Sequence, residues 1–264
     1  MIRFILHSII VVLLTVLSQV GGMIYLISII AIKSKKKNHR LKRVTLFFTL
    51  YLLSTFLIVP WIAPYFGRQK IQDNDKIKAQ FVFTKLLNRN YVTEELHESL
   101  IAIADQFHRK HPQIQLIYLD ANFPFFDGFP LLPHLSHNDG KKIDISFIYK
   151  DENGEITNEK PSNSGYGIFV APKANETNQT EACQAMGAWQ YDFPKYLTFG
   201  SQDELEVDAL TTKDLIRFIL NHSEVEKIFL EPHLKKRWNL NASKIRFQGC
   251  HSVRHDDHIH IQIN

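Results

Sequence analysis

Two long runs without a charged side chain dominate the first quarter of the chain. Residues 4–32 and 44–66 contain no Asp, Glu, Lys or Arg. A helix that spans a bilayer needs about 20 apolar residues, and in the membrane it must satisfy its own backbone hydrogen bonds. The runs therefore predict two transmembrane helices, at about 4–32 and 44–66. We expect residues 1–66 to be a retained anchor, because the first run is longer than the core of a signal peptide.

The segment between the two runs is strongly basic. Seven of the eleven residues 33–43 are Lys or Arg. Such a loop marks the cytoplasmic side of a membrane, so both chain ends are expected on the opposite side. Residues 1–66 hold 8 of the 31 basic side chains and no acidic one, which leaves 23 basic and 27 acidic side chains for the remainder. This balance argues against a nucleic-acid partner, because the remainder has no basic excess.

The remainder predicts one mixed domain. We expect a linker and lead-in over residues 67–90 and a single domain over 91–264. Apolar side chains at helical spacing predict helices over 93–111 and 211–222. Alternating or short apolar runs predict strands over 114–119, 143–149, 166–170, 225–230, 245–247 and 258–263. Because these elements follow no regular strand–helix–strand rhythm, the predicted fold class is α+β.

Histidines are concentrated at the C-terminal end. Four of the thirteen lie in the last fourteen residues, and the candidates are His251, His255, His258 and His260. On a strand His258 and His260 point to the same face, about 6.6 Å apart along the backbone. Two imidazoles on one face suit a metal site, and the alternative is the solvated face of an edge strand.

A second cluster favours the metal site. His137 lies in a loop, Gly140 permits a tight turn, and Asp144 lies on the polar face of a strand whose other face is apolar. A buried carboxylate there needs a partner. Histidines and a carboxylate with one open position are typical of catalytic zinc, whereas calcium and magnesium prefer oxygen ligands.

These motifs resemble a known family. Ser136-His137-x-x-Gly140-x-x-x-Asp144, followed by His258-x-His260, is similar to the zinc peptidases grouped with lysostaphin and the D-Ala-D-Ala peptidases. The string Arg254-His-Asp-Asp-His-Ile-His260, together with residues 225–230 and 244–246, resembles the penicillin-insensitive murein endopeptidases among them. The resemblance covers roughly residues 90–264 and implies a zinc-peptidase domain with a central antiparallel sheet. Lys142 departs from it, because many relatives have a small residue there.

The resemblance implies roles for the matching residues. His137, Asp144 and His260 would ligate Zn²⁺. His258 would act as a base or stabilise the tetrahedral intermediate, and His255 would support the site or contact substrate. Asp256 and Asp257 either orient the imidazoles or are solvated loop charges. His134 and His251 are left without a role.

The function expected from this pattern is that of a membrane-anchored zinc metallopeptidase. It would hydrolyse amide bonds in peptidoglycan cross-link peptides, with its catalytic domain on the periplasmic or extracellular side of the cell membrane. The alternatives are a non-catalytic zinc-binding or cell-wall-binding module on the same scaffold, and a D,D- or L,D-carboxypeptidase.

The two cysteines support an extracytoplasmic domain. Cys183 and Cys250 are the only cysteines, and both follow the anchor. Disulfides persist outside the cytoplasm, so we expect a bond between the two. The alternative is a pair of buried free thiols.

Overall fold

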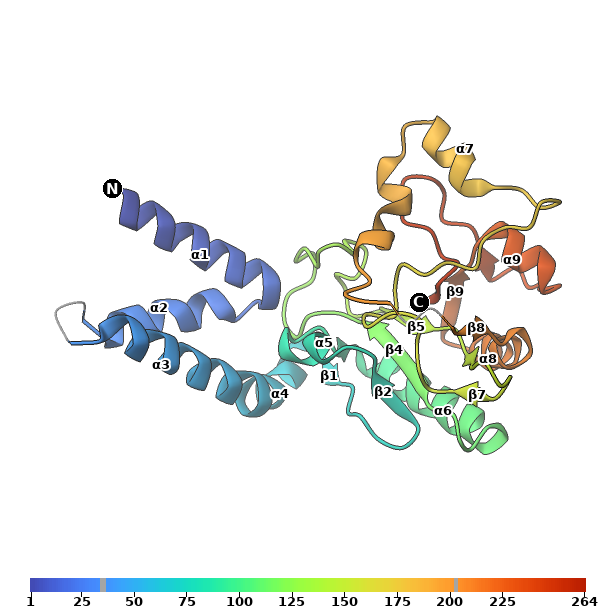
Figure 1. Cartoon of the computed structure of the whole chain (residues 1–264). Coiled ribbons are helices and arrows are strands. Elements are labelled where there is room, and N and C mark those ends of the chain that lie inside the picture. The colour runs from blue at the N-terminus through green and yellow to red at the C-terminus, as the bar shows by residue number, and fades with distance from the viewer. Residues whose placement is uncertain (34–36, 202–203) are drawn as a thin grey trace. The chain divides into compact units, whose positions relative to one another are not determined.

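The computed structural model describes residues 1–33, 37–201 and 204–264, so residues 34–36 of the predicted cytoplasmic loop lie outside the described residues. The chain forms two compact units (Figure 1). The first comprises Met1–Ile71, Phe83–Glu94 and Ala121–Gly140, and the second comprises Gln72–Val82, Glu95–Asp120 and Lys141–Asn264. The predicted domain boundaries stay predictions.

The first apolar run is not one helix. It forms α1 (Ile2–Ser18) and α2 (Gly21–Ala31), and the chain turns between them at Gln19, whose φ is 61°. The prediction of a single span over 4–32 is therefore wrong. Counting charges cannot detect a turn built from uncharged residues.

Two glycines allow the second helix to fold back along the first. A Cβ on Gly21 would lie 2.8 Å from the carbonyl oxygen of Leu14, and one on Gly22 would lie 2.0 Å from the hydroxyl of Thr15. Only glycine permits such a close approach of two helices. The hydroxyl group of Tyr25 on α2 lies 2.7 Å from Nδ1 of His7 on α1, which fixes the antiparallel pairing.

The second apolar run is part of one long helix. It extends over His39–Phe66, 28 residues, and among the described residues it is the one helix long and apolar enough to cross a membrane. Arg43 at its start donates hydrogen bonds to the carbonyl oxygens of Ile29 and Ile32, and so holds the end of α2 beside it. Its segments are α3 (His39–Leu53), the π-helical turn η1 (Ser54–Ile58), α4 (Val59–Ile62) and the 3₁₀ turn η2 (Ala63–Phe66). The short elements β1 (Gln69–Lys70), α5 (Val82–Leu86) and β3 (Tyr91–Val92) follow.

A six-stranded mixed sheet forms the centre of the second unit. Its order is β10-β9-β11-β5-β4-β2. The strands are β2 (Ile77–Ala79), β4 (Leu116–Asp120), β5 (Lys142–Ser146), β9 (Val225–Phe229), β10 (Ile245–Arg246) and β11 (His258–Ile263). A small antiparallel sheet contains β6 (Tyr149–Lys150), β7 (Ile156–Thr157) and β8 (Glu206–Val207).

The sheet departs from the predicted antiparallel arrangement at its edges. Its four central strands are antiparallel, but β10 runs parallel to β9 and β2 runs parallel to β4. Parallel neighbours need a crossover of a dozen or more residues. The crossover from β9 to β10 contains α9 (Pro232–Arg237), and β2 is in the stretch predicted as linker.

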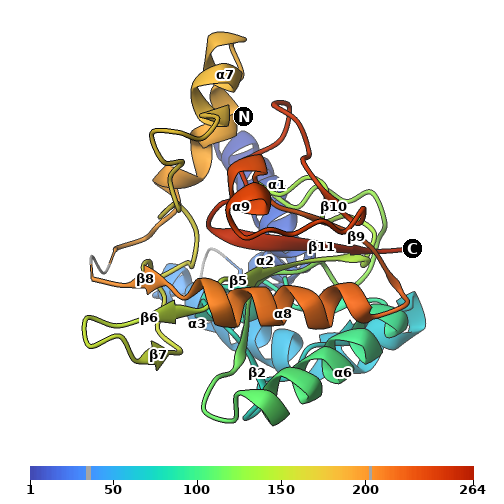
Figure 2. The same cartoon turned by 90° about the vertical axis from the view of Figure 1, so that its right-hand side faces the viewer.

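Isoleucine pairs build the core of the sheet. Ile259 lies opposite Ile145, and Ile261 lies opposite both Ile143 and Ile228. All five side chains are buried. Residues directly opposite on antiparallel strands share a face, so the alternate positions form a polar face. Helices α6 (Glu94–Lys110) and α8 (Ala209–Asn221), which confirm the two predicted helices, lie side by side against the sheet (Figure 2).

Some of the other predicted elements are confirmed and some are wrong. Residues 166–170 form no strand, and the alternating run over 143–149 is divided between β5 and β6. The helices α7 (Gln179–Ala185) and η3 (Trp189–Tyr196) were not predicted. The disulfide between Cys183 and Cys250 is confirmed.

Candidate metal centre

The register of two neighbouring strands brings the central residues of the site together. On β11, His260 lies opposite Asp144 of β5, and His258 lies opposite Ser146. All four side chains are buried on the polar face of the sheet. The alternation seen in the sequence therefore places a carboxylate and two imidazoles on one face, although His260 and Asp144 are 116 residues apart in the chain.

Asp144 contacts both strand histidines and a tyrosine on this face. Its Oδ1 lies 2.8 Å from Nδ1 of His260 and 3.7 Å from Nε2 of His258. Its Oδ2 accepts a hydrogen bond of 2.7 Å from the hydroxyl group of Tyr166. The ring of Tyr166 also packs edge-on against His258, with ring centres 5.1 Å apart.

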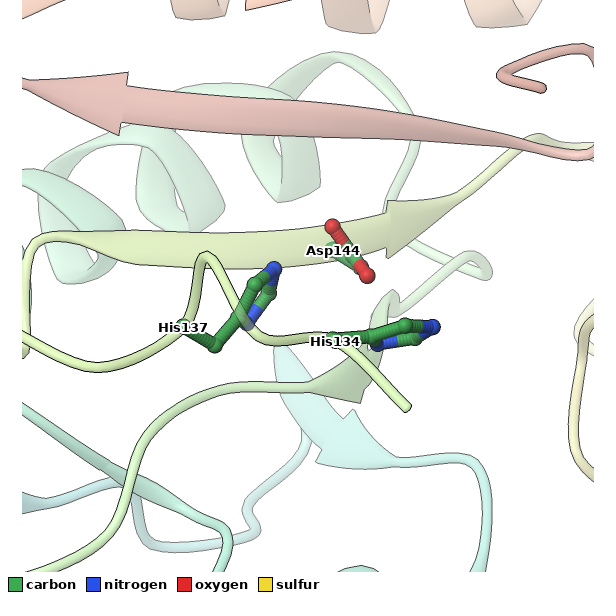
Figure 3. A group of neighbouring side chains, drawn as sticks. All are labelled: His134, His137 and Asp144. Carbon is green, nitrogen blue, oxygen red and sulfur yellow. The ribbon is translucent and has the colours of Figure 1, made fainter. Parts of the chain in front are cut away.

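Two loop histidines complete a group that can hold a metal ion. His134, His137 and Asp144 are all buried, and one potential ligand atom of each lies within 4.8 Å of the others. Figure 3 shows Asp144 on its strand beside the two histidines of the preceding loop. Nδ1 of His137 lies 2.9 Å from the carbonyl oxygen of Ala121. Since a carbonyl only accepts, this contact places the proton on Nδ1, and Nε2 is then the atom that would bind a metal.

Two imidazoles and one carboxylate form a donor set of the kind that zinc sites use. Zn–N and Zn–O bonds of about 2.0–2.2 Å in tetrahedral geometry put ligand atoms about 3.3 Å apart. Nδ1 of His260 lies 2.8 Å from Oδ1 of Asp144, which is a hydrogen-bond distance, and His260 is not one of the three residues of this group. A set dominated by imidazole nitrogens does not suit calcium or magnesium.

His258 is held from its other side. Its Nδ1 donates to Oδ1 of Asp257, and Oδ2 of Asp257 accepts the backbone N–H of Gly167 at 2.7 Å. Gly167 has φ of 86°, and a Cβ there would lie 2.5 Å from the carbonyl oxygen of Pro194. Burial lowers the pKa of His258, but the charges of Asp144 and Asp257 outweigh burial and raise it to about 9.

His255 packs against both strand histidines. Its ring centre lies 4.9 Å from that of His258 and 5.7 Å from that of His260. Its backbone N–H donates to Oε1 of Glu231, whose other oxygen accepts the hydroxyl of Tyr191 at 2.6 Å. Burial chiefly raises the pKa of Glu231 to about 7.

Asp256 and Asp257 have different partners. Asp256 is fully buried and receives two hydrogen bonds from Arg254, which also contacts Asp192 of η3. Asp257 holds His258 instead. Neither is a solvated loop charge, so that alternative is wrong for both.

The structure brings together most of the predicted site residues. Asp144, His258 and His260 share one face of the sheet, His255 packs against the two strand histidines, and His137 joins Asp144 in the group that can hold a metal ion. His251 is exposed. Sequence reasoning did not assign a role to His134 or to the hydroxyl of Tyr166. The one sequence signal for a role of His134 in the metal-binding group is its position three residues before His137.

Neither a family model nor a curated protein matches this sequence. The functional assignment therefore rests on the residues and on their geometry.

Proposed function

We propose that this protein is a membrane-anchored zinc metallopeptidase that cuts peptide cross-links of peptidoglycan outside the cytoplasm. The observation that carries the proposal is the placement of Nδ1 of His260 and Nε2 of His258 at 2.8 Å and 3.7 Å from the same oxygen of Asp144. The proposal takes His260 as a ligand, and it takes His258, which faces the same oxygen and is held from its other side by Asp257, as the group that handles protons.

Zinc would be held by Asp144, His137 and His260, and His134 is close enough to be a further ligand. When bound, zinc lowers the pKa of water and polarises a carbonyl group. Tyr166 fixes the carboxylate through Oδ2, so Oδ1 stays directed at the histidines.

His258 is the proposed proton carrier. Zinc held by Asp144 would offset the carboxylate charge that raises the pKa of His258. With its Nδ1–H held by Asp257, Nε2 of His258 could then take a proton from the attacking water and deliver it to the leaving amine as the C–N bond breaks. The water oxygen ends in the new carboxylate, and the amine leaves with the proton. His255 packs beside this ring and limits its rotation.

The membrane segment and the disulfide support the proposed location. Helices α1 and α2 carry many exposed apolar side chains, among them Phe4, Ile9 and Ile30. We therefore infer that both helices lie in the bilayer beside the His39–Phe66 helix. The antiparallel pairing then puts the start of α1 on the same side as loop 33–43, the cytoplasm, and not on the outer side. The Cys183–Cys250 bond is consistent with an oxidising compartment for the second unit.

Reporters test this topology. A reporter active only outside the cytoplasm should be active after Asn264 and silent before Met1 and within loop 33–43. An active reporter before Met1 would contradict the paired insertion of α1 and α2. An inactive reporter after Asn264 would mean that the second unit lies in the cytoplasm, where it has no access to peptidoglycan.

The activity itself is tested on a cross-linked peptide dimer without sugars. The full-length protein in detergent is incubated with the dimer, and the products are identified by mass spectrometry. The wild type should release two monomers, and so should His251→Ala, the control with an exposed histidine. His258→Ala should be slower by about 10²–10⁴.

The products also separate the alternatives. Release of a terminal D-alanine from an intact cross-link would make the protein a carboxypeptidase. An uncut dimer with bound zinc would make it a binding module and refute the peptidase proposal.

A further inference from the structure

A hollow beside η3 is not used by the metal centre. Its volume is about 340 Å³, within the range of small-ligand sites. It is lined by Gln184, Gly187, Trp189, Asp192, Lys195 and Tyr196.

Exposed aromatic rings form one wall of the hollow. Trp189 is 74% exposed and Tyr196 is 70% exposed. Phe193 lies between them, with its ring centre 6.1 Å from that of Trp189 and 5.9 Å from that of Tyr196. Aromatic rings have a negative face that attracts weakly positive C–H groups, and a contiguous group of exposed rings is typical of a ligand-binding surface. The wall therefore suits a flat, C–H-rich ligand face.

The charges in the hollow are already paired. Lys195 forms an ion pair of 2.7 Å with Asp192 and lies over the ring of Tyr196. Asp192 also accepts from Arg254 at 3.1 Å. The two charged residues that line the hollow, Lys195 and Asp192, carry opposite charges, so they leave no excess charge to attract an ion. They still offer hydrogen-bond donors and acceptors, as does Gln184, to an uncharged polar ligand.

The hollow is held on a rigid support. The disulfide joins Cys183 of α7 to Cys250, and the side chain of Gln190 donates to the carbonyl oxygen of Cys250 at 3.1 Å. Cys183, Ala188 and Tyr191, which alternate in the sequence with residues that line the hollow, form a small buried cluster. A site held in advance loses little entropy on binding.

We propose that this hollow binds a sugar ring of the glycan chain to which the cross-linking peptides are attached. A pyranose ring has C–H faces for Trp189 and Tyr196 and an uncharged rim of hydroxyl and acetamido groups for Gln184, Asp192 and Lys195. The choice of an N-acetylated glycan rests on the proposed function, whereas the choice of a saccharide rests on the hollow. Binding would hold the enzyme on its polymer between cuts.

The test measures binding of peptide-free glycan strands to the full-length protein in detergent. Trp189→Ala and Tyr196→Ala should each weaken binding about tenfold or more, as expected for a central aromatic residue of a binding site. Phe199→Ala is the matched control, because Phe199 is 63% exposed and does not line the hollow. It should bind as the wild type does.

Activity provides the second readout. Trp189→Ala should cut the sugar-free peptide dimer at the wild-type rate but release fewer products from intact wall polymer. The glycan-binding proposal is overturned if wild-type protein does not bind the strands, if Trp189→Ala binds equally well, or if the sugar-free dimer displaces them. The last outcome would make the hollow a peptide site. A failure of the proposed function appears separately, as a dimer that stays uncut while the strands still bind.

Discussion

Replacing Asp257 by Asn tests whether His258 is held for proton transfer. Asp257 is fully buried and accepts two hydrogen bonds, from Nδ1 of His258 and from the N–H of Gly167. Asn has the same shape but offers one acceptor and one donor group. Either one of the two N–H groups then faces another donor, or the amide group donates to Nδ1 and the proton of His258 moves to Nε2.

The replacement should affect both stability and turnover. A buried donor left without an acceptor costs about 1–3 kcal/mol, so the free energy of unfolding should fall by that amount in Asp257→Asn. Loss of the carboxylate also removes the group that fixes the proton on Nδ1. In serine proteases, replacing the Asp that holds the catalytic histidine by Asn lowers turnover about 10⁴-fold, and we expect a loss of about 10²–10⁴ here.

A double-mutant cycle is the assay. Turnover, zinc content and unfolding in urea are measured for Asp257→Asn, His258→Ala and the double variant, with the exposed Asp75→Asn as control. If Asp257 acts through His258, its replacement should lower turnover only while His258 is present. Equal losses in both backgrounds, or loss of zinc in Asp257→Asn, would refute this reasoning.

Two further predictions concern stability. Burial, with the nearby charge of Lys78, lowers the pKa of Lys160 to about 7. In the unfolded chain the Lys160 side chain keeps its proton up to about pH 10.4. From about pH 7 to 10 the unfolded chain therefore binds more protons than the folded protein. The free energy of unfolding rises with pH in that window. Urea unfolding at about pH 7 and pH 9 should show a smaller rise in the free energy of unfolding for Lys160→Met than for the wild type. An equal rise in both would contradict the lowered pKa of Lys160. Replacing Cys183 and Cys250 by Ser, at a sequence separation of 67, should lower the free energy of unfolding by about 4 kcal/mol. A loss below about 1 kcal/mol in urea unfolding would show that the bond does not constrain the unfolded chain.

Periodicity predicted the elements that position the site. The alternation of Ile259 and Ile261 with His258 and His260 correctly gave β11 and its polar face. The pairing of that face with Asp144 could not be predicted from spacing alone, because it depends on the register between strands 116 residues apart.

Other features left a weak signal or none. The glycine pair Gly21-Gly22 marked the place where α1 and α2 separate, but its effect depends on the close approach to Leu14 and Thr15. Helix η3 contains Pro194, which argues against a helix, so its aromatic wall was not predicted although Trp189, Phe193 and Tyr196 lie at helical spacing. Tyr166 reaches Asp144 from an irregular segment, where no periodicity places a side chain.

Zinc content measured beside turnover tests the central claim most directly. Metal per chain is determined for the wild type, His260→Ala and His258→Ala after purification in detergent, together with the rate on the peptide dimer. The wild type should hold about one zinc, and His260→Ala should lose zinc and activity together. His258→Ala should keep its zinc and lose about 10²–10⁴ in rate. A His258→Ala variant without zinc, beside a His260→Ala variant that retains it, would contradict the account.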